Sequence, residues 1–579
     1  MVGFASWKSS SLLVGLGLLA IPGKVSAQAP TVSLTGNATV IGTRSIYGLE
    51  EFLGISYAQP PVGNLRYAAP VPANYSSTTA INATAYGPVC MQDTSDFNVT
   101  QMSEDCLSVN VVRPTGVNAT AKLPVMMWVY GGSFLNGGSP LYDPTAIILR
   151  SVQLSQPVIY VSFNYRVNSF GFLGSSDMAA AAKKGSTVLN AGLYDIQAAF
   201  QWTQKNIASF GGDPTKVTAF GESAGAIGIG SMLVAGRGKA VKKLGLFRGA
   251  IMESGAPSGD PVPPPSYLDP RYEAFVTASG CGPALANGTA IACLRSMPTA
   301  VVYNASLLLL STSTLALPFN RVIDGYFHDS SPSIQVRGKR VSTIPLMMGN
   351  NLDEGTLFAS SSVNDSSEFV PVIESGLYIN NATEGSLTKT LVPDLLKLYP
   401  DNPALDSPFA PLTVSPSYRF YEPLATNQYK RYAAVLGDSI FQAGRRLLLD
   451  AYLARDKFYP VYNYLFVQNT PGATPALGVY HSSEIQYVYG KFAALNATSV
   501  EGQTSIAMLD AWLQFAHTLS PNGAGLSTWP KYGTSRTTMQ FGIPANSTAT
   551  NVTALIKDNY RVSGIAFLGS EPWTTANYI

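Results

Sequence analysis

The strongest chemical signal in the sequence is a serine between two glycines. Residues 221–225 read Gly-Glu-Ser-Ala-Gly, and they lie between an expected strand, Lys216–Phe220, and an expected small-residue helix, Ala224–Val234. In this setting the pattern predicts a sharp strand-to-helix turn, because the glycines let neighbouring backbone approach without a Cβ clash. The turn would hold the hydroxyl at a helix N-terminus, whose dipole favours negative charge. Ser223 is therefore the candidate nucleophile.

A serine nucleophile requires a base, and the chain contains three histidines. His517 falls in an expected helix, where its register suits packing or a solvated face, and His328 falls in a loop that is expected to lead away from the core. His481 follows a late expected strand, Pro460–Val467, and an apolar loop. Because a nucleophile on such a turn takes its histidine from a late loop, His481 is the candidate general base.

An orienting acid is expected between the serine and the histidine in chain order. Glu354 and Asp353 follow the expected strand Ile344–Gly349, with Glu354 the first choice and Asp353 the alternative. A buried carboxylate would fix the imidazole tautomer and stabilise the imidazolium that forms during attack.

The same chemistry requires backbone N–H groups directed at the oxygen on which negative charge develops. The glycine-rich segment after the expected strand Pro124–Tyr130 supplies such groups at Gly132 and Ser133, and the amide of Ala224 adds another. These three residues are the candidate oxyanion hole.

Strand-length apolar runs alternate with helical periodicity along the chain. The expected strands are Cys106–Arg113, Pro124–Tyr130, Pro157–Asn164, Lys216–Phe220, Leu246–Met252, Ile344–Gly349 and Pro460–Val467, and the expected helices are Leu193–Ser209, Ala224–Val234, Asn427–Arg455 and Ser505–Leu519. This alternation predicts an α/β fold with a large, mostly parallel central sheet flanked by helices. The Pro-rich, partly helical stretch Pro257–Pro332 indicates a helical insertion, so residues 28–579 are expected to form a single domain.

The N-terminus has the pattern of a secretory signal peptide. Lys8 precedes the apolar stretch Leu12–Ile21, and small residues at positions 25 and 27 predict cleavage after Ala27, so that residues 1–27 are removed and the protein is secreted. Export would also permit N-glycosylation at Asn-x-Ser/Thr sites. Their asparagines are Asn37, Asn74, Asn82, Asn98, Asn118, Asn287, Asn304, Asn364, Asn381, Asn496, Asn546 and Asn551.

Four cysteines in a chain bound for an oxidising compartment predict two disulfides. Of the possible pairings, the one between nearest neighbours joins Cys90 to Cys106 and Cys281 to Cys293.

The composition excludes several other classes of protein. With 46% apolar and 12% charged residues, the chain can bury a large core and is not disordered. A formal net charge of +2 gives no field that would attract nucleic acid. No His/Cys cluster has metal-ligand spacing, so neither a metal nor a cofactor is expected, and no segment after the signal is long enough to span a membrane. The sequence does not indicate an oligomeric state.

Several segments together resemble the type-B carboxylesterase/lipase family, whose members include cholinesterases and fungal lipases and sterol esterases. Residues 210–225 look like its serine signature, and residues 104–111 (Glu-Asp-Cys-Leu-Ser-Val-Asn-Val) resemble its second signature. Asn164-Tyr165-Arg166 is similar to another family landmark, and residues 246–255 look closest to the fungal lipase branch.

The resemblance implies an α/β-hydrolase fold and hydrolysis of a small-molecule or lipid ester through an acyl-enzyme. Carried over residue by residue, it implies that Ser223 is the nucleophile, Glu354 the acid and His481 the base. It likewise implies an oxyanion hole at residues 132, 133 and 224. The nearest-neighbour disulfide pairing also fits the family pattern.

The chain departs from the family pattern in two places. Ser133 stands where the family commonly has a third consecutive glycine, and its side chain is expected to crowd the alcohol side of the site. The loop between Cys90 and Cys106 is shorter than the lid of fungal lipases and largely polar, and it lacks the tryptophan that cholinesterases carry there. An interfacial lid requires an apolar face, so a carboxylesterase with little interfacial activation is expected, with a true lipase or sterol esterase as the alternative.

The alternative class of function is adhesion or binding, because the family includes such proteins, whose catalytic residues are damaged. All three candidate positions are intact in this chain, which favours an enzyme.

Overall fold

The computed structural model describes residues 28–76, 80–312, 318–360, 363, 365, 367–368, 384–400, 428–523, 528–544 and 547–579. The expected signal peptide lies outside the described residues, as do three of the glycosylation asparagines, Asn364, Asn381 and Asn546. The chain divides into two compact units. The first runs up to Arg248 and includes Val262–Ser330, and the second comprises Gly249–Pro261 and Ser331–Ile579.

The first unit contains a layer of strands in the order β11-β9-β10-β8-β4-β3. Their bounds are β3 Thr43–Arg44, β4 Glu50–Ser56, β8 Ser108–Arg113, β9 Leu123–Val129, β10 Ile159–Phe163 and β11 Gly212–Glu222. Strands β11, β9 and β10 are parallel to one another, whereas β8, β4 and β3 each run antiparallel to the preceding neighbour. The predicted parallel strands are therefore confirmed here, and the N-terminal strands add an antiparallel edge.

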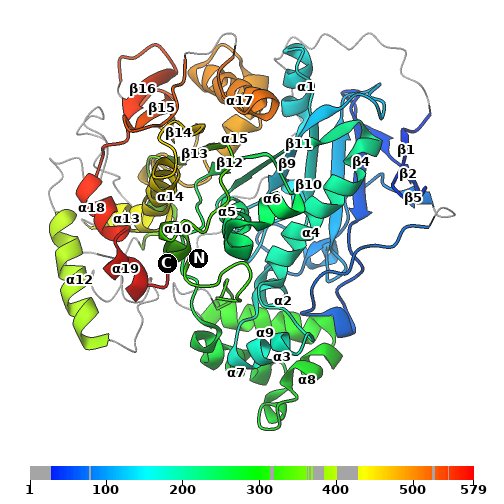
Figure 1. Cartoon of the computed structure of the whole chain (residues 1–579), viewed down its shortest axis with the longest axis vertical. Coiled ribbons are helices and arrows are strands. Elements are labelled where there is room, and N and C mark those ends of the chain that lie inside the picture. Colours follow the sequence, from blue (N-terminus) through cyan, green and yellow to red (C-terminus); the bar gives the residue numbers. More distant parts are fainter. Residues whose placement is uncertain are drawn as a thin grey trace. The chain divides into compact units, whose positions relative to one another are not determined.

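Both faces of this layer are covered, which explains the continuous apolar runs in the sequence. Successive residues of a strand point to opposite faces. On β9, Met127 contacts Thr203 of helix α4 (Ala191–Asn206), and the Trp128 ring lies 4.9 Å from that of Tyr142 on the other face. Figure 1 shows α4 lying across the strands beside α5 (Ala224–Gly238).

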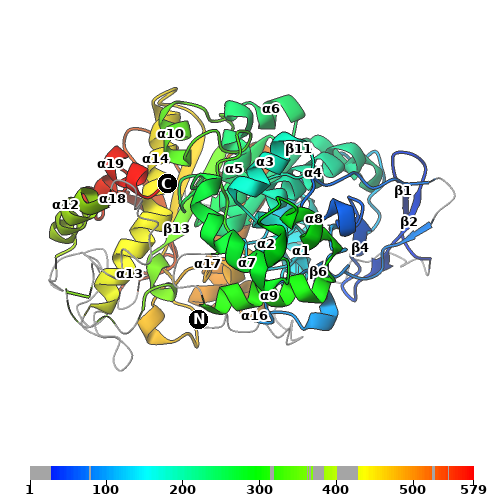
Figure 2. The same cartoon turned by 90° about the horizontal axis from the view of Figure 1, so that it is seen from below.

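Shorter elements complete the first unit. They are β1 Thr31–Ser33, β2 Thr39–Ile41, η1 Gly63–Leu65, β5 Ala80–Asn82, β6 Val89–Cys90, η2 Val99–Gln101, β7 Met102–Ser103, η3 Ser139–Leu141, α1 Thr145–Gln153, α2 Asn168–Phe172, α3 Ser176–Lys183, η4 Ile207–Phe210, α6 Ala240–Leu244, η5 Pro265–Leu268, α7 Asp269–Ala278, η6 Gly282–Ala284, α8 Ala290–Ser296 and α9 Thr299–Thr312. Helices α7, α8 and α9 lie together, as Figures 1 and 2 show, and they form the predicted helical stretch.

The second unit contains the strands β12 (Gly249–Glu253), β13 (Leu346–Asn351), β14 (Val461–Phe466) and β15 (Thr537–Phe541), which are parallel and adjacent in this order. Strand β16 (Thr553–Lys557) pairs antiparallel with β15. Every residue of β12, β13 and β14 is buried, which indicates that helices cover these strands on both faces.

Two helices cover these opposite faces. On β14, Asn463 accepts a hydrogen bond from Arg445 of α14 (Ala443–Leu453), and the ring of the next residue, Tyr464, lies 5.3 Å from that of Trp512 in α17 (Val500–Thr518). Because neighbouring residues point to opposite sides of a strand, α14 and α17 lie on opposite faces.

The expected single helix over Asn427–Arg455 is interrupted. The described part consists of α13 (Tyr429–Gly437), a π-helical turn at Asp438–Gln442, and α14. The apolar periodicity does not reveal the interruption, because a π turn adds about one residue without breaking the chain of backbone hydrogen bonds.

The other elements of the second unit are short, apart from α12. They are α10 Pro332–Arg337, η7 Glu354–Leu357, α12 Glu384–Leu398, η11 Pro475–Leu477, α15 Ile485–Val488, α16 Lys491–Leu495, α18 Val562–Leu568 and α19 Glu571–Ala576.

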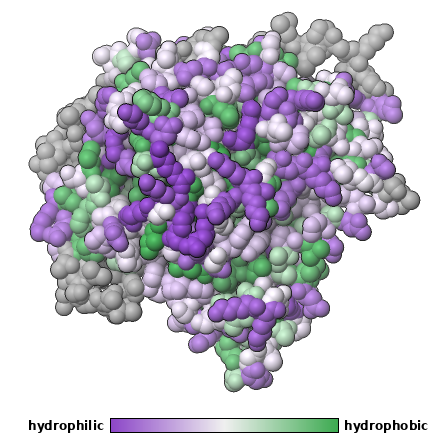
Figure 3. Space-filling view, in the orientation of Figure 1, coloured by the Kyte–Doolittle hydropathy of each residue, from purple (hydrophilic) through white to green (hydrophobic). Residues whose placement is uncertain are grey.

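Disulfides join Cys90 to Cys106 and Cys281 to Cys293, both within the first unit. On the face shown in Figure 3, hydrophilic residues predominate and hydrophobic residues form small patches between them. Within the described ranges, no single helix combines the length and apolar character needed to cross a membrane; α8 and α9, bent by 117° at their junction, meet that test only as a pair.

Candidate active site

The candidate nucleophile lies on a tight turn between β11 and α5. Ser223 has φ 54° and ψ −126°, a conformation that L-residues rarely adopt and that the strand-to-helix turn imposes. The flanking glycines are required sterically: a Cβ at Gly225 would lie 1.9 Å from the carbonyl oxygen of Val129, and one at Gly221 would lie 2.5 Å from the same oxygen. The structure therefore has the local geometry that the Gly-x-Ser-x-Gly pattern predicts.

The glycine-rich segment after β9 lies against this serine. A Cβ at Gly131 would lie 2.9 Å from the Cβ of Ser223, so only glycine permits this approach. Gly132 has φ 102° and Ser133 has φ 57°, which turns the segment sharply back. The amide of Ala224 is the first of helix α5, and the first four N–H groups of a helix have no partner within it. The segment after β9 and the first residue of α5 thus both adjoin Ser223.

In the second unit the structure brings Glu354 and His481 together. The Oε2 atom of Glu354 lies 2.6 Å from Nδ1 of His481, and both side chains are almost excluded from solvent. Glu354 begins η7, directly beyond β13, and His481 lies on the loop between β14 and α15. An ionised Glu354 accepts this hydrogen bond, so the hydrogen of the neutral imidazole lies on Nδ1, and Nε2 is its basic nitrogen.

The second oxygen of Glu354 is held by three donors. Oε1 accepts hydrogen bonds from Ser254 Oγ at 2.6 Å, from the backbone N–H of Asn351 at 2.7 Å and from Asn350 Nδ2 at 3.2 Å. A buried carboxylate is stabilised when its lone pairs are occupied in this way. No pattern in the sequence identified Ser254 as part of this network, although it lies in residues 246–255, which look closest to the fungal lipase branch.

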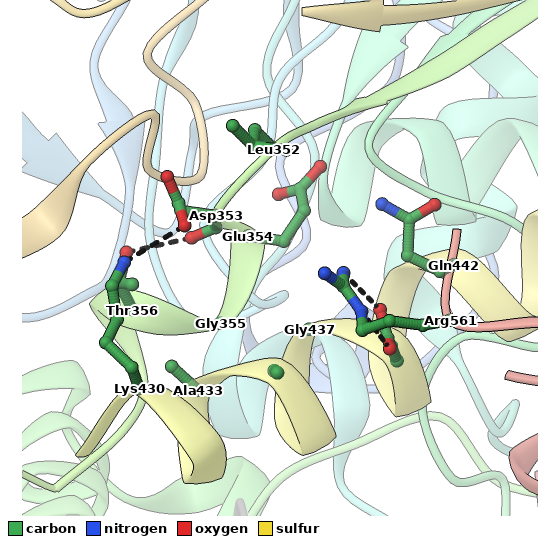
Figure 4. Close-up of a pocket in the computed structure, with 12 residues that line it drawn as sticks. Leu352, Asp353, Glu354, Gly355, Thr356, Lys430, Ala433, Gly437, Gln442 and Arg561 are labelled. Atoms are coloured by element: carbon green, nitrogen blue, oxygen red, sulfur yellow. Dashed lines mark hydrogen bonds and ion pairs between the residues drawn. The ribbon is translucent and has the colours of Figure 1, made fainter. Parts of the chain in front are cut away.

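The alternative acid, Asp353, has other partners. Its Oδ1 accepts a hydrogen bond from Lys430 Nζ at 3.0 Å, and its Oδ2 accepts one from the backbone N–H of Val479 at 2.9 Å. Figure 4 shows Lys430 extending from helix α13 to Asp353, while the carboxylate of Glu354 points away from both. The two adjacent carboxylates therefore have different tasks, and only Glu354 contacts the imidazole.

Two aromatic rings pack against His481. The ring of Phe441 stacks on the imidazole with centroids 4.4 Å apart and an interplanar angle of 29°, and the ring of Phe358 lies 5.2 Å away at 55°. Phe441 belongs to the π turn, which is the kind of helix irregularity often found at functional sites. No signal in the sequence singles out either phenylalanine.

The other two histidines are placed differently. The expectation that His328 lies on a loop leading away from the core was wrong: His328 is completely buried, its backbone N–H bonds to Asp324, and its ring lies 3.4 Å from Arg321. An aspartate-capped turn draws this loop inward, and apolar periodicity does not report such a turn. His517 lies in the last turn of α17, as expected for a helical position.

Across the described ranges, no group of three or more His, Cys, Asp or Glu side chains is arranged to hold a metal ion.

The sequence model of the carboxylesterase family matches residues 25–560, and the chain therefore belongs to this family. It is 37% identical to Lipase 4 of Diutina rugosa over 94% of this chain and 97% of that protein. It is also 34% identical to Secreted lipase 1 of Botryotinia fuckeliana (strain B05.10), over 88% of this chain and 89% of that protein.

Among solved structures, the chain is similar to that of Aspergillus niger EstA. The TM-score is 0.79 at 25% sequence identity, and the match covers 95% of this chain and 99% of that chain. Together with the strand orders and covering helices of both units, this likeness confirms the predicted α/β-hydrolase fold. Membership of the family makes the protein a serine carboxylic ester hydrolase.

Replacement of Phe441 by alanine tests whether the stacked ring matters to the imidazole. Aromatic stacking contributes about 0.5–1.5 kcal/mol, and contact of a ring face with a cation adds a similar amount. We expect kcat for a nitrophenyl ester to fall roughly tenfold with little change in KM, because a His481 that acts as the general base becomes an imidazolium in the transition state and would lose this neighbour. The control is Phe567→Ala, which removes a ring packed on Trp573 instead. Equal kcat values for Phe441→Ala and the wild type would show that the stacked ring does not matter to the imidazole.

Proposed function

We propose that this protein is a secreted carboxylesterase that works through a Ser-His-Glu triad and an acyl-enzyme. In this proposal residues 1–27 are a signal peptide and residues 28–579 form a single catalytic domain. Ser223 is the nucleophile, His481 the general base and Glu354 the orienting acid. The observation that carries the proposal is the 2.6 Å contact between Glu354 Oε2 and His481 Nδ1 at the ends of two parallel strands.

The first half of the reaction acylates the serine. His481 Nε2 takes the hydroxyl proton as Ser223 Oγ attacks the ester carbonyl carbon, and Glu354 stabilises the imidazolium that results. The carbonyl oxygen becomes an oxyanion, which accepts hydrogen bonds from the backbone N–H groups of Gly132, Ser133 and Ala224. The imidazolium then gives its proton to the alcohol oxygen as the carbon–oxygen bond breaks, and the alcohol leaves.

The second half releases the acid. His481 takes a proton from a water molecule, which attacks the acyl carbon, and the imidazolium returns that proton to Ser223 Oγ as the ester bond to the enzyme breaks. The enzyme is regenerated and the kinetics are of the ping-pong type. No cofactor enters either half.

A phosphonate probe tests the nucleophile. A nitrophenyl phosphonate should release one nitrophenolate per active chain and leave its adduct on the peptide that contains Ser223, as read by mass spectrometry. Ser223→Ala should form no adduct and should lower kcat roughly 10⁶-fold, as loss of a triad nucleophile does. Ser535→Ala, which changes an exposed serine, should behave as the wild type. An adduct on another residue, or full activity of Ser223→Ala, would contradict the proposal. Full activity of Ser223→Ala would exclude a triad enzyme with this nucleophile and would also exclude an inactive binding protein.

The loop between Cys90 and Cys106 supports an esterase without strong interfacial activation. Met91, Phe97 and Met102 are buried, and Val99 is the one exposed apolar side chain between the two cysteines. Gln92 fixes the loop to the segment that follows β9, because its side chain donates to the carbonyl oxygen of Gly137 at 2.7 Å and accepts from its N–H at 2.8 Å. A single exposed valine does not make the apolar face that an interfacial lid requires.

A second attachment holds the end of the same loop. Glu104 forms a bidentate ion pair with Arg66, and both side chains are buried. This pair would be lost if this end of the loop opened, so the charge-assisted hydrogen bonds favour the closed position of the loop. A lipase or sterol esterase remains the second candidate, because several curated relatives are named as lipases.

Rates across the solubility limit of a short-chain triglyceride separate these two candidates. We expect the rate to follow a single saturation curve through the point at which tributyrin forms droplets, because no apolar face becomes exposed there. The initial rate at constant stirring is the measurement, with nitrophenyl butyrate as the soluble reference. A sharp rise at the solubility limit would identify a lipase.

Ser133 is proposed to restrict the alcohol part of the substrate. Its φ of 57° lies in the left-handed region that favours glycine, and a non-glycine residue there is strained by about 1–2 kcal/mol. The N–H of Ser133 serves the oxyanion hole, whereas the side chain occupies room that a glycine would leave open. Esters of bulky tertiary alcohols are therefore expected to be poor substrates.

The substitution Ser133→Gly tests this restriction. The variant keeps the backbone donor and relieves the strained conformation, so kcat/KM for a primary-alcohol ester should change little. Relative activity on a tertiary-butyl ester should rise about 10-fold or more, which corresponds to removal of roughly 1.4 kcal/mol of steric repulsion. An unchanged ratio of the two activities would show that the side chain does not limit the alcohol.

Secretion is supported by the surface position of the glycosylation sequons. Every sequon asparagine in the described residues is exposed, as an attached glycan requires. They are Asn37, Asn74, Asn82, Asn98, Asn118, Asn287, Asn304, Asn496 and Asn551. We propose that at least some of them carry N-glycans, and similarity to Secreted lipase 1 of Botryotinia fuckeliana is in keeping with export.

A further inference from the structure

A buried lysine lies beneath the turn that carries the catalytic acid. Lys430 belongs to the first turn of α13, and its ammonium contacts Asp353 at 3.0 Å, with side-chain exposures of 3% and 5%. Lysine is almost never buried to this extent unless it is paired. Burial lowers the pKa of Lys430 below its ordinary 10.5, and the charge of Asp353 acts in the opposite direction.

Asp353 connects this cation to the histidine loop. Its Oδ2 accepts a hydrogen bond from the backbone N–H of Val479, and its own N–H donates to the carbonyl oxygen of Val479, each at 2.9 Å. Val479 stands two residues before His481, and Glu354 directly follows Asp353. The consecutive residues 353 and 354 therefore hold the histidine loop at two points, one through its backbone and one through the imidazole.

Helix α13 makes further contacts with the same turn. Tyr429 donates a hydrogen bond to the carbonyl oxygen of Thr356 at 2.6 Å, and Thr356 Oγ1 donates to that of Leu477 at 2.7 Å. A Cβ at Gly355 would lie 1.8 Å from the carbonyl oxygen of Ala433, so the helix and the turn are in close backbone contact. The backbone of Lys430 is thus fixed relative to the turn that carries Asp353, whose carboxylate the ammonium contacts (Figure 4).

We propose that Lys430 is a positioning residue for catalysis: by neutralising Asp353, it keeps that carboxylate in place as the acceptor that sets the distance between Glu354 and His481. The proposal rests on the proposed function. Without a cation, the buried Asp353 charge would stand beside the like charge of Glu354, and the two would repel each other. The turn would relieve this repulsion by moving Asp353, and the N–H of Val479 would lose its acceptor.

Stabilisation of the fold alone does not account for this pair. An apolar pair of similar volume often stabilises a protein as well as a buried ion pair does, or better. An apolar residue at position 353 would fill the space but could not accept the hydrogen bond from Val479. The particular value of the ion pair is therefore the geometry that it gives to the histidine loop.

The test compares Lys430→Met with a double variant, Lys430→Met with Asp353→Asn. A displacement of about 1 Å in a catalytic group can lower the rate about 10²-fold. We expect Lys430→Met to lower kcat 10- to 100-fold with KM unchanged within about twofold, and to slow phosphonate labelling of Ser223 in parallel. The double variant should regain most of the lost kcat, because it removes both charges while the amide oxygen introduced at position 353 can still accept from Val479. If Lys430→Met does not fold, Lys430→Gln replaces it with the same expectation.

Arg113→Met is the matched control. Arg113 forms a buried ion pair with Glu50 at 2.8 Å, with exposures of 7% and 6%. In the pairing of β8 with β10 it lies beside the first residues of β10, whereas Ser223 follows the last residue of the parallel strand β11. Arg113 is therefore at the end of the first unit's strands that is remote from the nucleophile. The control should lower Tm while leaving kcat within about twofold of the wild type, assayed well below the Tm of each variant.

The outcomes separate the two proposals. If the wild type neither hydrolyses esters nor labels at Ser223, the proposed function fails. If the wild type is active and kcat of Lys430→Met stays within twofold of it, the positioning role is overturned. Loss of kcat that is the same in Lys430→Met and the double variant, or the same in Arg113→Met, overturns it as well. Recovery in the double variant alone supports it.

Discussion

A carboxylate that is buried beside an imidazole has to be solvated by the protein itself, and this requirement organises much of the second unit. Glu354 cannot reach water, so Ser254 beyond β12 and the end of β13 supply the donors that its Oε1 requires. Only then is Oε2 available to hold Nδ1 of His481 at 2.6 Å. The electrostatic value of the contact comes from the exclusion of water, and the same exclusion makes every unpaired polar group nearby unfavourable.

The two units meet their chemical requirements by different means. Around Ser223 the geometry comes from the backbone: a strained φ at the serine and glycines at positions 131, 221 and 225, where any side chain would collide with neighbouring atoms. Around His481 it comes mainly from side chains, and the contacts of Glu354 with His481 and Ser254 join residues that are remote in sequence. Backbone geometry of the first kind leaves a short motif in the sequence, whereas side-chain geometry of the second kind does not.

That difference explains how much could be predicted. The strands that lead to Ser223 and Glu354 were predicted to within a few residues, because buried parallel strands are short, continuous apolar runs between glycine- and proline-bearing loops. The Gly-x-Ser-x-Gly turn was predicted because its backbone geometry leaves a short motif in the sequence. The site as a whole was not predicted, because Ser254, Phe441 and Lys430 have no local signature in the sequence. Lys430 followed by Arg431 has the appearance of a solvated helix end. The inward course of the loop at His328 was mispredicted, because a capping contact to Asp324, not apolar periodicity, determines it.

Because of the π turn at Asp438–Gln442, the number of residues in this helical segment matters as well as their identity. Each residue rotates an α-helix by about 100°, and a π turn absorbs roughly one residue more than an α turn does. Helix α13 can therefore face η7 while α14 faces β13 and β14, and the ring at their junction is directed at the imidazole. Deleting a single residue here would rotate the side chains on one side of the turn about the helix axis. Insertions and deletions in this helix are therefore more tightly constrained than substitutions on its surface.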